Sequence, residues 1–347
     1  MTGEPAGRQP TRVRAGRLAA LGAFVALAAI ALGWSAPTSS AHPVTSASPV
    51  GSASRDSPVA QLPRQVDEQP EQLSAADAVI LGLVEGITEY LPISSTGHLV
   101  VTERLLDLGT TEPSKAAIDS YTVIIQFGAI LAVLLLYRKR VADVLLGIVG
   151  RSETGRRLLV ALLVAFVPFG IVGFLFNEKV DEHLLEPVPI AIAWIVGGLA
   201  ILLLIDRLRR NATVGTALDE ITVRQAAIIG IVQVLALWPG VSRSLVTIVA
   251  ALLVGLRLVA AVEFSFLLGL VTLGSASIFS AARDGSAVVD AYGLAMPALG
   301  VAVAALSAAA AVASLVAYLN RRDLKVFGWY RLAVGVATLA LVATNVI

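Results

Sequence analysis

Long apolar segments fill the chain from residue 74 to its end, and their lengths predict helices that cross a membrane. An α-helix rises 1.5 Å per residue, so about 20 residues are needed to cross a hydrocarbon core of about 30 Å. Polar positions separate six stretches of about this length, namely 118–137, 156–176, 188–206, 260–282, 293–318 and 327–346. The pattern therefore predicts an all-α polytopic membrane protein.

Two other apolar regions, 76–107 and 224–256, are interrupted by a polar break. The first break, at 92–97, reads Pro-Ile-Ser-Ser-Thr-Gly, and the second, at 239–244, reads Pro-Gly-Val-Ser-Arg-Ser. Each half is too short to span a membrane. Irregular backbone at membrane depth needs protein or a wet cavity around it, so each region is predicted to be a re-entrant helical hairpin.

The two breaks resemble each other, which indicates an internal duplication. At a constant offset, Glu85 falls on Gln233 and Ser94 falls on Ser242. Each copy would be one hairpin plus three transmembrane helices. An odd number of crossings inverts the second copy, and inverted repeats with broken helices are a known membrane-protein plan. The predicted repeats cover 76–206 and 207–347.

Composition supports a chain dissolved in lipid. Only 15% of residues are charged and 56% are hydrophobic, with a mean hydropathy of +0.81. These values exclude an ordinary soluble enzyme, a disordered chain and a nucleic-acid binder. The chain contains no cysteine, which excludes disulfides and thiolate chemistry.

The positions of the basic residues predict the orientation in the membrane. Loops 138–157, 207–224 and 320–325, together with the N-terminal Arg8, Arg12, Arg14 and Arg17, hold 17 of the 26 Lys and Arg residues, whereas the outer segments hold five. Cytoplasmic loops carry an excess of Lys and Arg. These loops are therefore predicted to be cytoplasmic, so that the first hairpin enters from outside and the second from inside.

The first 75 residues have a different composition. A basic flank precedes the short apolar run 18–34, which is typical of a signal peptide or signal anchor over residues 1–35. Residues 36–75 are rich in Pro, Ser, Gln and Ala without apolar periodicity, and we expect a disordered extracytoplasmic linker.

Ionisable residues inside the hairpins point to a functional site, because a charge at membrane depth costs about 3 kcal/mol or more. Glu85 and Glu89 are four residues apart, so a helix presents both from one face. Two such carboxylates can share a divalent cation such as Mg²⁺ together with phosphate oxygens. In the alternative interpretation, one carboxylate only neutralises Arg243.

Hydroxyl residues mark the start of each second half-helix. Ser94, Ser95 and Thr96 lie there in the first hairpin, and Ser242 and Ser244 in the second. Such hydroxyls are ordinary N-caps. A helix N-terminus also favours phosphate, because it offers free N–H groups and a positive dipole end.

Arg243 lies between the two serines of the second break, where it could bind a phosphate through two hydrogen bonds. If the tips meet, two helix N-termini and this arginine converge into an anion site. His98 follows Ser95 by three residues. It could be a general base for Ser95, a general acid for the leaving phosphate, or the nucleophile.

These motifs resemble a known family. Residues 85–99 read Glu-Gly-Ile-Thr-Glu-Tyr-Leu-Pro-Ile-Ser-Ser-Thr-Gly-His-Leu, 237–244 read Leu-Trp-Pro-Gly-Val-Ser-Arg-Ser, and 263–268 read Glu-Phe-Ser-Phe-Leu-Leu. They are similar to signatures of the undecaprenyl-diphosphate phosphatases of the bacitracin-resistance type. The resemblance covers about residues 75–347, and the first motif is long and specific.

The resemblance implies an enzyme that removes the terminal phosphate of a C55 polyprenyl diphosphate, giving the carrier lipid of cell-wall assembly. It implies a divalent cation (Mg²⁺ or Ca²⁺), a place in the bacterial inner membrane, and a site reachable from the outer leaflet. The implied catalytic residues are Glu85, Glu89, Ser95, His98 and Arg243, with the cation on the two glutamates. Ser94, Thr96, Ser242, Ser244 and Thr247 are expected to bind the substrate.

One position departs from the family pattern, because Leu245 stands where the family has glycine after Ser-Arg-Ser. We expect this leucine to shift the second tip or to mark a different lipid preference. The alternative function is a transporter or flippase for a polyprenyl phosphate or a small anion, since inverted repeats suit alternating access. The sequence is also compatible with a homodimer.

Overall fold

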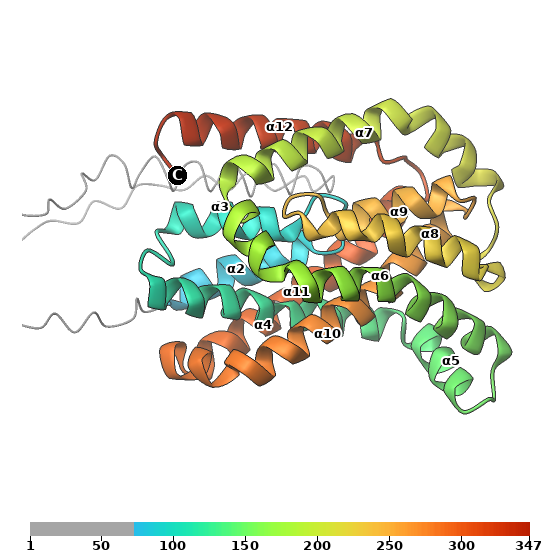
Figure 1. The fold of residues 1–347 in the computed structure, drawn as a ribbon, viewed down its shortest axis with the longest axis horizontal. Helices are drawn as coiled ribbons and strands as arrows, with labels where there is room; N and C mark the ends of the chain where they lie inside the picture. The colour runs from blue at the N-terminus through green and yellow to red at the C-terminus, as the bar shows by residue number, and fades with distance from the viewer. Residues whose placement is uncertain (1–72) are drawn as a thin grey trace, which may run out of the picture.

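The computed structural model describes residues 73–347, and nearly all regular structure in this range is helical (Figure 1). The elements in chain order are α2 (Ala75–Thr88), α3 (Ser95–Leu106), α4 (Glu112–Leu136), α5 (Arg138–Ile148), α6 (Glu153–Leu184), α7 (Pro187–Val214), η1 (Leu218–Glu220), α8 (Val223–Gln233), η2 (Val234–Leu237), α9 (Arg243–Leu253), α10 (Leu258–Tyr292), α11 (Ala295–Leu319) and α12 (Lys325–Ala343). The predicted signal segment and all but the end of the predicted linker lie outside the described residues.

All six predicted transmembrane stretches are helices. By length and composition, α4, α6, α7, α10, α11 and α12 can each cross a membrane, and they run roughly along the longest axis of the molecule (Figure 1). Helices α6, α7 and α10 are longer than predicted. Hydropathy reports where a helix leaves the lipid, whereas backbone hydrogen bonding continues into the polar flanks.

Both interrupted regions fold as a helix, a break and a second helix. The first consists of α2 and α3, with 14 and 12 residues. The second consists of α8, the 3₁₀ turn η2 and α9, where α8 and α9 have 11 residues each. At these lengths no single half can cross a bilayer, as the sequence predicted.

The predicted cytoplasmic loop 138–157 contains a helix that the sequence pattern missed. Helix α5 begins with Arg-Lys-Arg and is too short and too polar to span. It is stabilised by tertiary contacts instead: Arg140 Nε lies 2.7 Å from Glu263 Oε1, and Arg140 Nη1 lies 2.7 Å from Asp219 Oδ1. Local hydropathy does not report such partners.

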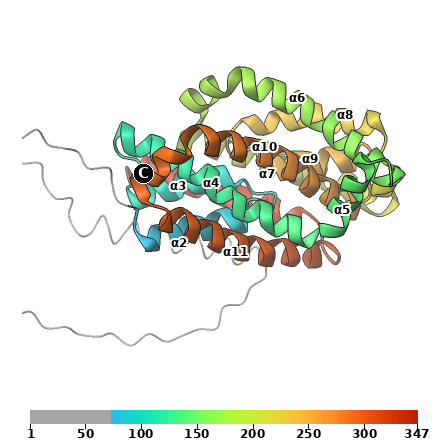
Figure 2. The same cartoon turned by 90° about the horizontal axis from the view of Figure 1, so that it is seen from below.

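Helices distant in sequence pack side by side. Helix α7 packs against α12, α11 against both α2 and α4, α4 against α10, and α6 against α8 (Figures 1 and 2). Small residues permit close approach: a Cβ at Gly198 of α7 would lie 2.8 Å from the carbonyl oxygen of Gly328 in α12. Close van der Waals packing at small residues is the usual basis of helix association in lipid.

Large apolar side chains cover much of the outside of the bundle. Phe174 in α6, Leu203 in α7 and Leu306 in α11 are among the most exposed. In water such a surface would be unfavourable, whereas in a bilayer it contacts acyl chains. The surface therefore agrees with a multi-pass membrane protein.

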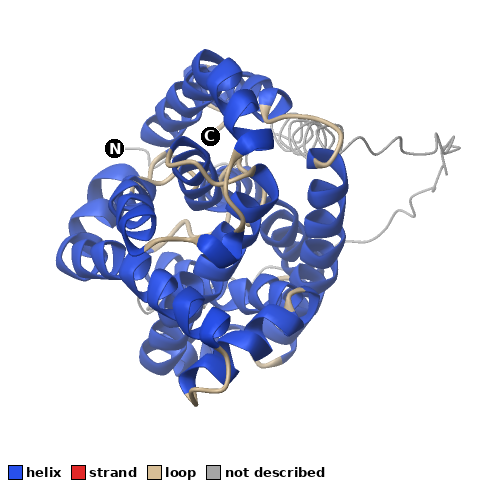
Figure 3. Ribbon diagram, turned by 90° about the vertical axis from the view of Figure 1, so that its right-hand side faces the viewer, coloured by secondary structure: helices blue, strands red, loops and turns tan. Residues whose placement is uncertain are grey.

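The arginine-rich loops meet at one end of the molecule, which faces the viewer in Figure 3. Arg140 contacts Asp219, and Arg209 pairs with Asp323. At the opposite end, Arg104 pairs with Glu186 at 3.0 Å. The two groups of loops thus separate as the charge pattern predicted. The inverted relation between the halves, and their division between 206 and 207, remain predictions.

Candidate active site at the two hairpin tips

The two breaks have the same backbone geometry. Ser94 has φ 74° and ψ 105°, and Ser242 has φ 75° and ψ 112°, in a region that residues with side chains seldom occupy. Each serine is an N-cap, with Ser94 Oγ accepting from the Gly97 N–H and Ser242 Oγ from the Leu245 N–H. The predicted half-helix starts are confirmed. Equal strain at both positions is what a duplication would produce.

The tips contact each other in the interior. Ser244 Oγ donates to the carbonyl oxygen of Leu91 at 2.8 Å, which joins the second break to the first. Arg331 of α12 supports the second tip, because its Nη2 donates to the carbonyl oxygens of Gly240 and Ala193, both at 2.9 Å. The convergence of two helix N-termini that the sequence predicted is therefore present.

Glu89 lies at the centre of this contact and joins residues of both hairpins. Its Oε1 is 3.0 Å from Arg243 Nη2, and its Oε2 accepts a hydrogen bond from the hydroxyl of Ser95. Both charged side chains are buried. Arg243 also donates to the carbonyl oxygen of Ser265 and lies over the ring of Tyr90. A carboxylate and a guanidinium are thus held beside a hydroxyl in a buried site, where electrostatic interactions are strong.

Glu85 has quite different surroundings. It is fully buried, and neither carboxyl oxygen has a hydrogen-bond partner among the described residues. Its electrostatic neighbours include Glu89 and Arg243. The Tyr90 hydroxyl and Arg243 Nε are likewise buried without a partner in the described part of the chain. Such groups are rare in folded proteins and call for a specific explanation.

The unpaired oxygens of Glu85 show whether the site fits the divalent cation that the family resemblance implies. No cluster of three or more acidic, His or Cys side chains occurs among the described residues. A cation held by protein alone is therefore not indicated. Mg²⁺, however, is commonly bound by one or two carboxylates with phosphate oxygens and water. The two unused oxygens of Glu85, beside Glu89, fit a divalent cation that arrives with a phosphate ligand.

His98 is buried one turn into α3 and is held by contacts on both ring nitrogens. Nδ1 lies 2.5 Å from the carbonyl oxygen of Ser94, and Nε2 lies 2.7 Å from the Tyr330 hydroxyl. Its ring packs against Trp194 at 4.9 Å. Because the hydroxyl of Ser95 donates to Glu89, the geometry favours Glu89 over His98 as the group that accepts the serine proton.

The remaining predicted binding residues are mostly engaged in the protein's own hydrogen bonds. Ser242 Oγ lies 3.0 Å from Ser244 Oγ, and Thr247 Oγ1 lies 2.7 Å from Ser265 Oγ. Thr96 is half-buried at the first turn of α3. The hydroxyls of Ser242, Ser244 and Thr247 therefore stabilise the second tip, whatever further contact they make with a ligand.

Leu245 is compatible with the same cap geometry at both tips, and its expected shift of the second tip relative to a family member with glycine stays a prediction. It is buried in the hydrophobic core, and the cap at Ser242 matches the one at Ser94. The equivalent residue of the first hairpin is Gly97, where a Cβ would approach Trp194 to 2.6 Å. The ring of Trp194 therefore requires glycine in the first hairpin, whereas the second accommodates a large side chain.

Several residues of the site were missed by the sequence analysis. Arg331 is fully buried in α12, and two of its nitrogens have no hydrogen-bond partner within the described residues. Its charge inside the predicted stretch 327–346 was a visible signal. Tyr330 and Trp194, which surround His98, carried no comparable signal, because aromatic residues are ordinary in transmembrane helices.

Three known proteins that are similar to this chain over most of its length are all undecaprenyl-diphosphatases. The chain is 42% identical over 267 residues to an undecaprenyl-diphosphatase of Sorangium cellulosum, covering 76% of this chain and 85% of that one. It is 43% identical over 263 residues to undecaprenyl-diphosphatase 2 of Rhodospirillum rubrum, with coverages of 76% and 93%. It is 41% identical over 262 residues to undecaprenyl-diphosphatase 1 of Chromobacterium violaceum, with coverages of 76% and 94%.

The matching segment contains every site residue described above. Residues 78–337 match the family described as bacitracin resistance protein BacA, and this range includes both hairpins and all six long helices except for a few terminal residues. The chain therefore belongs to the bacitracin resistance protein BacA family.

Proposed function

We propose that this protein is an undecaprenyl-diphosphate phosphatase, which hydrolyses the terminal phosphate of a C55 polyprenyl diphosphate to give the monophosphate carrier lipid. Family membership and the names of the relatives support this activity. The observation that carries the proposal is the meeting of Arg243 with Glu89 and Ser95 at the hairpin tips. A positively charged guanidinium can stabilise the transferring phosphoryl group, a carboxylate can accept a proton, and a hydroxyl can attack phosphorus.

The chain's own residues suit this reaction. The Arg243 guanidinium and the N-termini of α3 and α9 would bind the diphosphate oxygens. The nucleophile attacks the terminal phosphorus, the bond to the bridging oxygen breaks, and the lipid leaves as the monophosphate. Two nucleophiles are compatible with the geometry. If the Ser95 hydroxyl attacks, losing its proton to Glu89, the phosphoryl group is carried on Ser95 and a water molecule must then hydrolyse this phosphoserine to release inorganic phosphate. If a water molecule attacks, inorganic phosphate is released directly. His98, one turn further on, would contribute as the general acid that protonates the leaving monophosphate.

We further propose that Glu85 and Glu89 hold a divalent cation, Mg²⁺ or Ca²⁺, which would neutralise charge on the diphosphate when bound. The orphaned oxygens of Glu85 support this assignment. The charge pattern supports a site reached from the outer leaflet of the inner membrane, because the first hairpin is predicted to enter from outside. All five proposed catalytic residues come from one chain, so a homodimer is not needed to complete the site.

Phosphate release from undecaprenyl diphosphate by the purified protein tests the proposal. We expect release that stops with chelator and returns with added Mg²⁺ or Ca²⁺. Arg243→Ala and Glu89→Gln should each reduce it about 100-fold or more, the usual effect of removing a group that stabilises the transition state. Arg283→Ala, at an exposed arginine paired with Asp284, is the matched control. Undiminished release by both site variants would refute the site.

Two broken hairpins that meet inside the protein also suit a transporter or flippase for a polyprenyl phosphate or a small anion. Liposomes that contain the protein and a labelled polyprenyl phosphate distinguish the two functions. Lipid movement between leaflets without phosphate release from the diphosphate would favour this second function over the first.

A further inference from the structure

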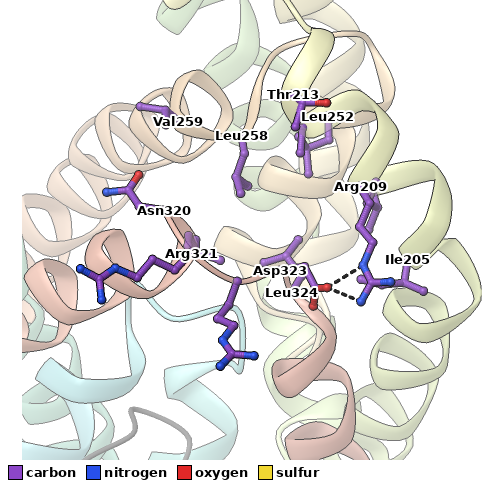
Figure 4. A pocket seen from close by; sticks show the side chains of 14 residues that line it. Ile205, Arg209, Thr213, Leu252, Leu258, Val259, Asn320, Arg321, Asp323 and Leu324 are labelled. Carbon is purple, nitrogen blue, oxygen red and sulfur yellow. Dashed lines mark hydrogen bonds and ion pairs between the residues drawn. The ribbon is translucent and has the colours of Figure 1, made fainter.

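A cavity of about 590 Å³ lies between α7, α9, α10 and the loop that joins α11 to α12 (Figure 4). It shares no residue with the hairpin-tip site. It lies at the end of the molecule that carries the arginine-rich loops, because Arg209, Arg321 and Arg322 belong to its lining. Neither the catalytic proposal nor the sequence motifs give this cavity a role.

The rim of the cavity carries an excess of positive charge. Arg209 pairs with Asp323, with Nε 2.6 Å from Oδ2, and Figure 4 shows the Arg321 side chain extending away from this pair. Arg321 and Arg322 are exposed and form no ion pair with another described residue. Asp323 is the single acidic residue of the lining, and its charge is already balanced by Arg209. Two guanidinium groups therefore remain for an anionic ligand.

The walls of the cavity are apolar. They consist of Ile205, Leu208, Ala212, Leu252, Leu258, Val259, Leu319 and Leu324. A second cavity of about 30 Å³ adjoins the first, sharing Leu258, Val259, Leu319 and Asn320. It adds Tyr137, Val262 and Val316, so the apolar surface continues between α10 and α11. Val259, common to both, is 55% exposed. The cavity therefore opens onto a surface suited to a hydrocarbon chain.

We propose that this cavity binds an anionic glycerophospholipid of the cytoplasmic leaflet, with its phosphate on Arg321 and Arg322 and an acyl chain along the walls. Basic pockets between transmembrane helices on the cytoplasmic side bind anionic lipid headgroups, and that leaflet supplies such lipids. Arginine binds phosphate through paired hydrogen bonds. Inorganic phosphate would leave the apolar walls in contact with water, and a zwitterionic lipid would leave the two positive charges uncompensated.

Native mass spectrometry of the purified full chain in detergent tests the proposal, with phosphatidylglycerol and phosphatidylcholine as probes. We expect one phosphatidylglycerol to bind in preference to phosphatidylcholine. Arg321→Ala with Arg322→Ala should weaken binding about 30-fold, which corresponds to about 2 kcal/mol. The matched control is Arg156→Ala with Arg157→Ala. This exposed pair lies near the start of α6, at the same end of the molecule but outside the cavity.

A second variant tests the apolar wall without changing charge. Val259→Trp projects a large ring into the path of the acyl chain, and it should reduce phosphatidylglycerol binding while both arginines remain. Thermal unfolding without lipid checks that each variant is folded, and the rise of Tm with added phosphatidylglycerol gives a second measure of binding. A rise in the wild type that the arginine variant and Val259→Trp both lack supports the proposal.

Other results would overturn it. Equal binding of the two lipids, or an equal loss in the Arg156 and Arg157 control, would reduce the effect to general surface charge. Displacement of the lipid by millimolar inorganic phosphate, with no effect of Val259→Trp, would identify a phosphate site without an acyl-chain wall. Preferential displacement by a polyprenyl monophosphate would assign the cavity to the reaction product.

Discussion

Glu85 and Glu89 lie one helical turn apart, yet only Glu89 has polar partners among the described residues. Glu89 is compensated by Arg243 and by the Ser95 hydroxyl, whereas both oxygens of Glu85 are buried without a partner among the described residues. Removing one partner from a buried ion pair is strongly destabilising. Keeping an uncompensated carboxyl group buried is also costly. The two glutamates should therefore affect stability in opposite directions.

We expect Glu85→Gln to leave the free energy of unfolding unchanged or to raise it by about 1 kcal/mol, because a neutral amide of the same shape replaces an uncompensated carboxyl. Glu89→Gln should lower it by about 3 kcal/mol, because it leaves Arg243 uncompensated. Both variants should lose phosphate release. Denaturant unfolding in detergent, alongside the phosphate assay, measures the two effects. If Glu85→Gln destabilises as much as Glu89→Gln, the contrast between the two environments is wrong.

At the scale of elements, the two hairpins share one cap geometry but differ in what packs on the half-helix that follows. Residue Gly97 of α3 faces Trp194 of α7, whose indole Nε1 donates to the carbonyl oxygen of Ile93 at 2.6 Å. Trp194 also packs on His98. Helix α7 thus fixes both the break and the histidine of the first hairpin. Leu245 occupies the equivalent position in the second hairpin and packs into the core.

We expect Gly97→Ala to lower the free energy of unfolding by about 1–3 kcal/mol, as overpacking of a filled interior does. Its methyl group would lie 2.6 Å from Trp194 and 2.8 Å from Ile190. The rate of phosphate release should also fall, because the displaced Trp194 ring packs against His98. The matched control is Gly274→Ala in α10, where a Cβ would have no atom within 4 Å. This control should be neutral or stabilising by up to about 1 kcal/mol. Equal effects of the two changes would contradict the proposed packing constraint.

At the scale of the whole molecule, the polar loops form two separate ends. Asn211 Nδ2 donates to the carbonyl oxygen of Leu252 at 2.9 Å, which joins the C-terminal ends of α7 and α9 at one end of the molecule. At the other end, the Tyr121 hydroxyl donates to the carbonyl oxygen of Met296. Basic residues concentrate at the first end. The positive-inside rule predicts that this end lies in the cytoplasm.

The absence of cysteine from the chain makes this orientation directly measurable. Single changes Glu182→Cys and Arg283→Cys should react with a membrane-impermeant maleimide on intact cells. Arg156→Cys and Arg224→Cys should react only after permeabilisation. All four native residues are exposed, so accessibility reports the side of the membrane. The reversed pattern would invert the molecule, and mixed reactivity within one end would contradict the alternation of the helices.

Much of the fold could be predicted from the sequence, because membrane spanning depends on local hydropathy. The six long helices, the two breaks and the serine caps were all predicted, whereas the pairing of Arg243 with one carboxylate was only the alternative interpretation of the two glutamates. Helix α5 was not predicted, because its support comes from other parts of the chain: it packs against α6, and Arg140 contacts Glu263 and Asp219. Such contacts join residues far apart in the chain, where periodicity carries no information.

The sequence by itself determined which residues could enter lipid and which charges would be too costly there without a function, because transfer into hydrocarbon depends on each side chain and its near neighbours. Only the tertiary structure decided the partners. It paired Glu89 with Arg243 and Ser95, left Glu85 without a partner among the described residues, and seated His98 between Trp194 and Tyr330. A side chain's partner in a low-dielectric interior depends on which helices pack together, and that arrangement arises from the whole bundle.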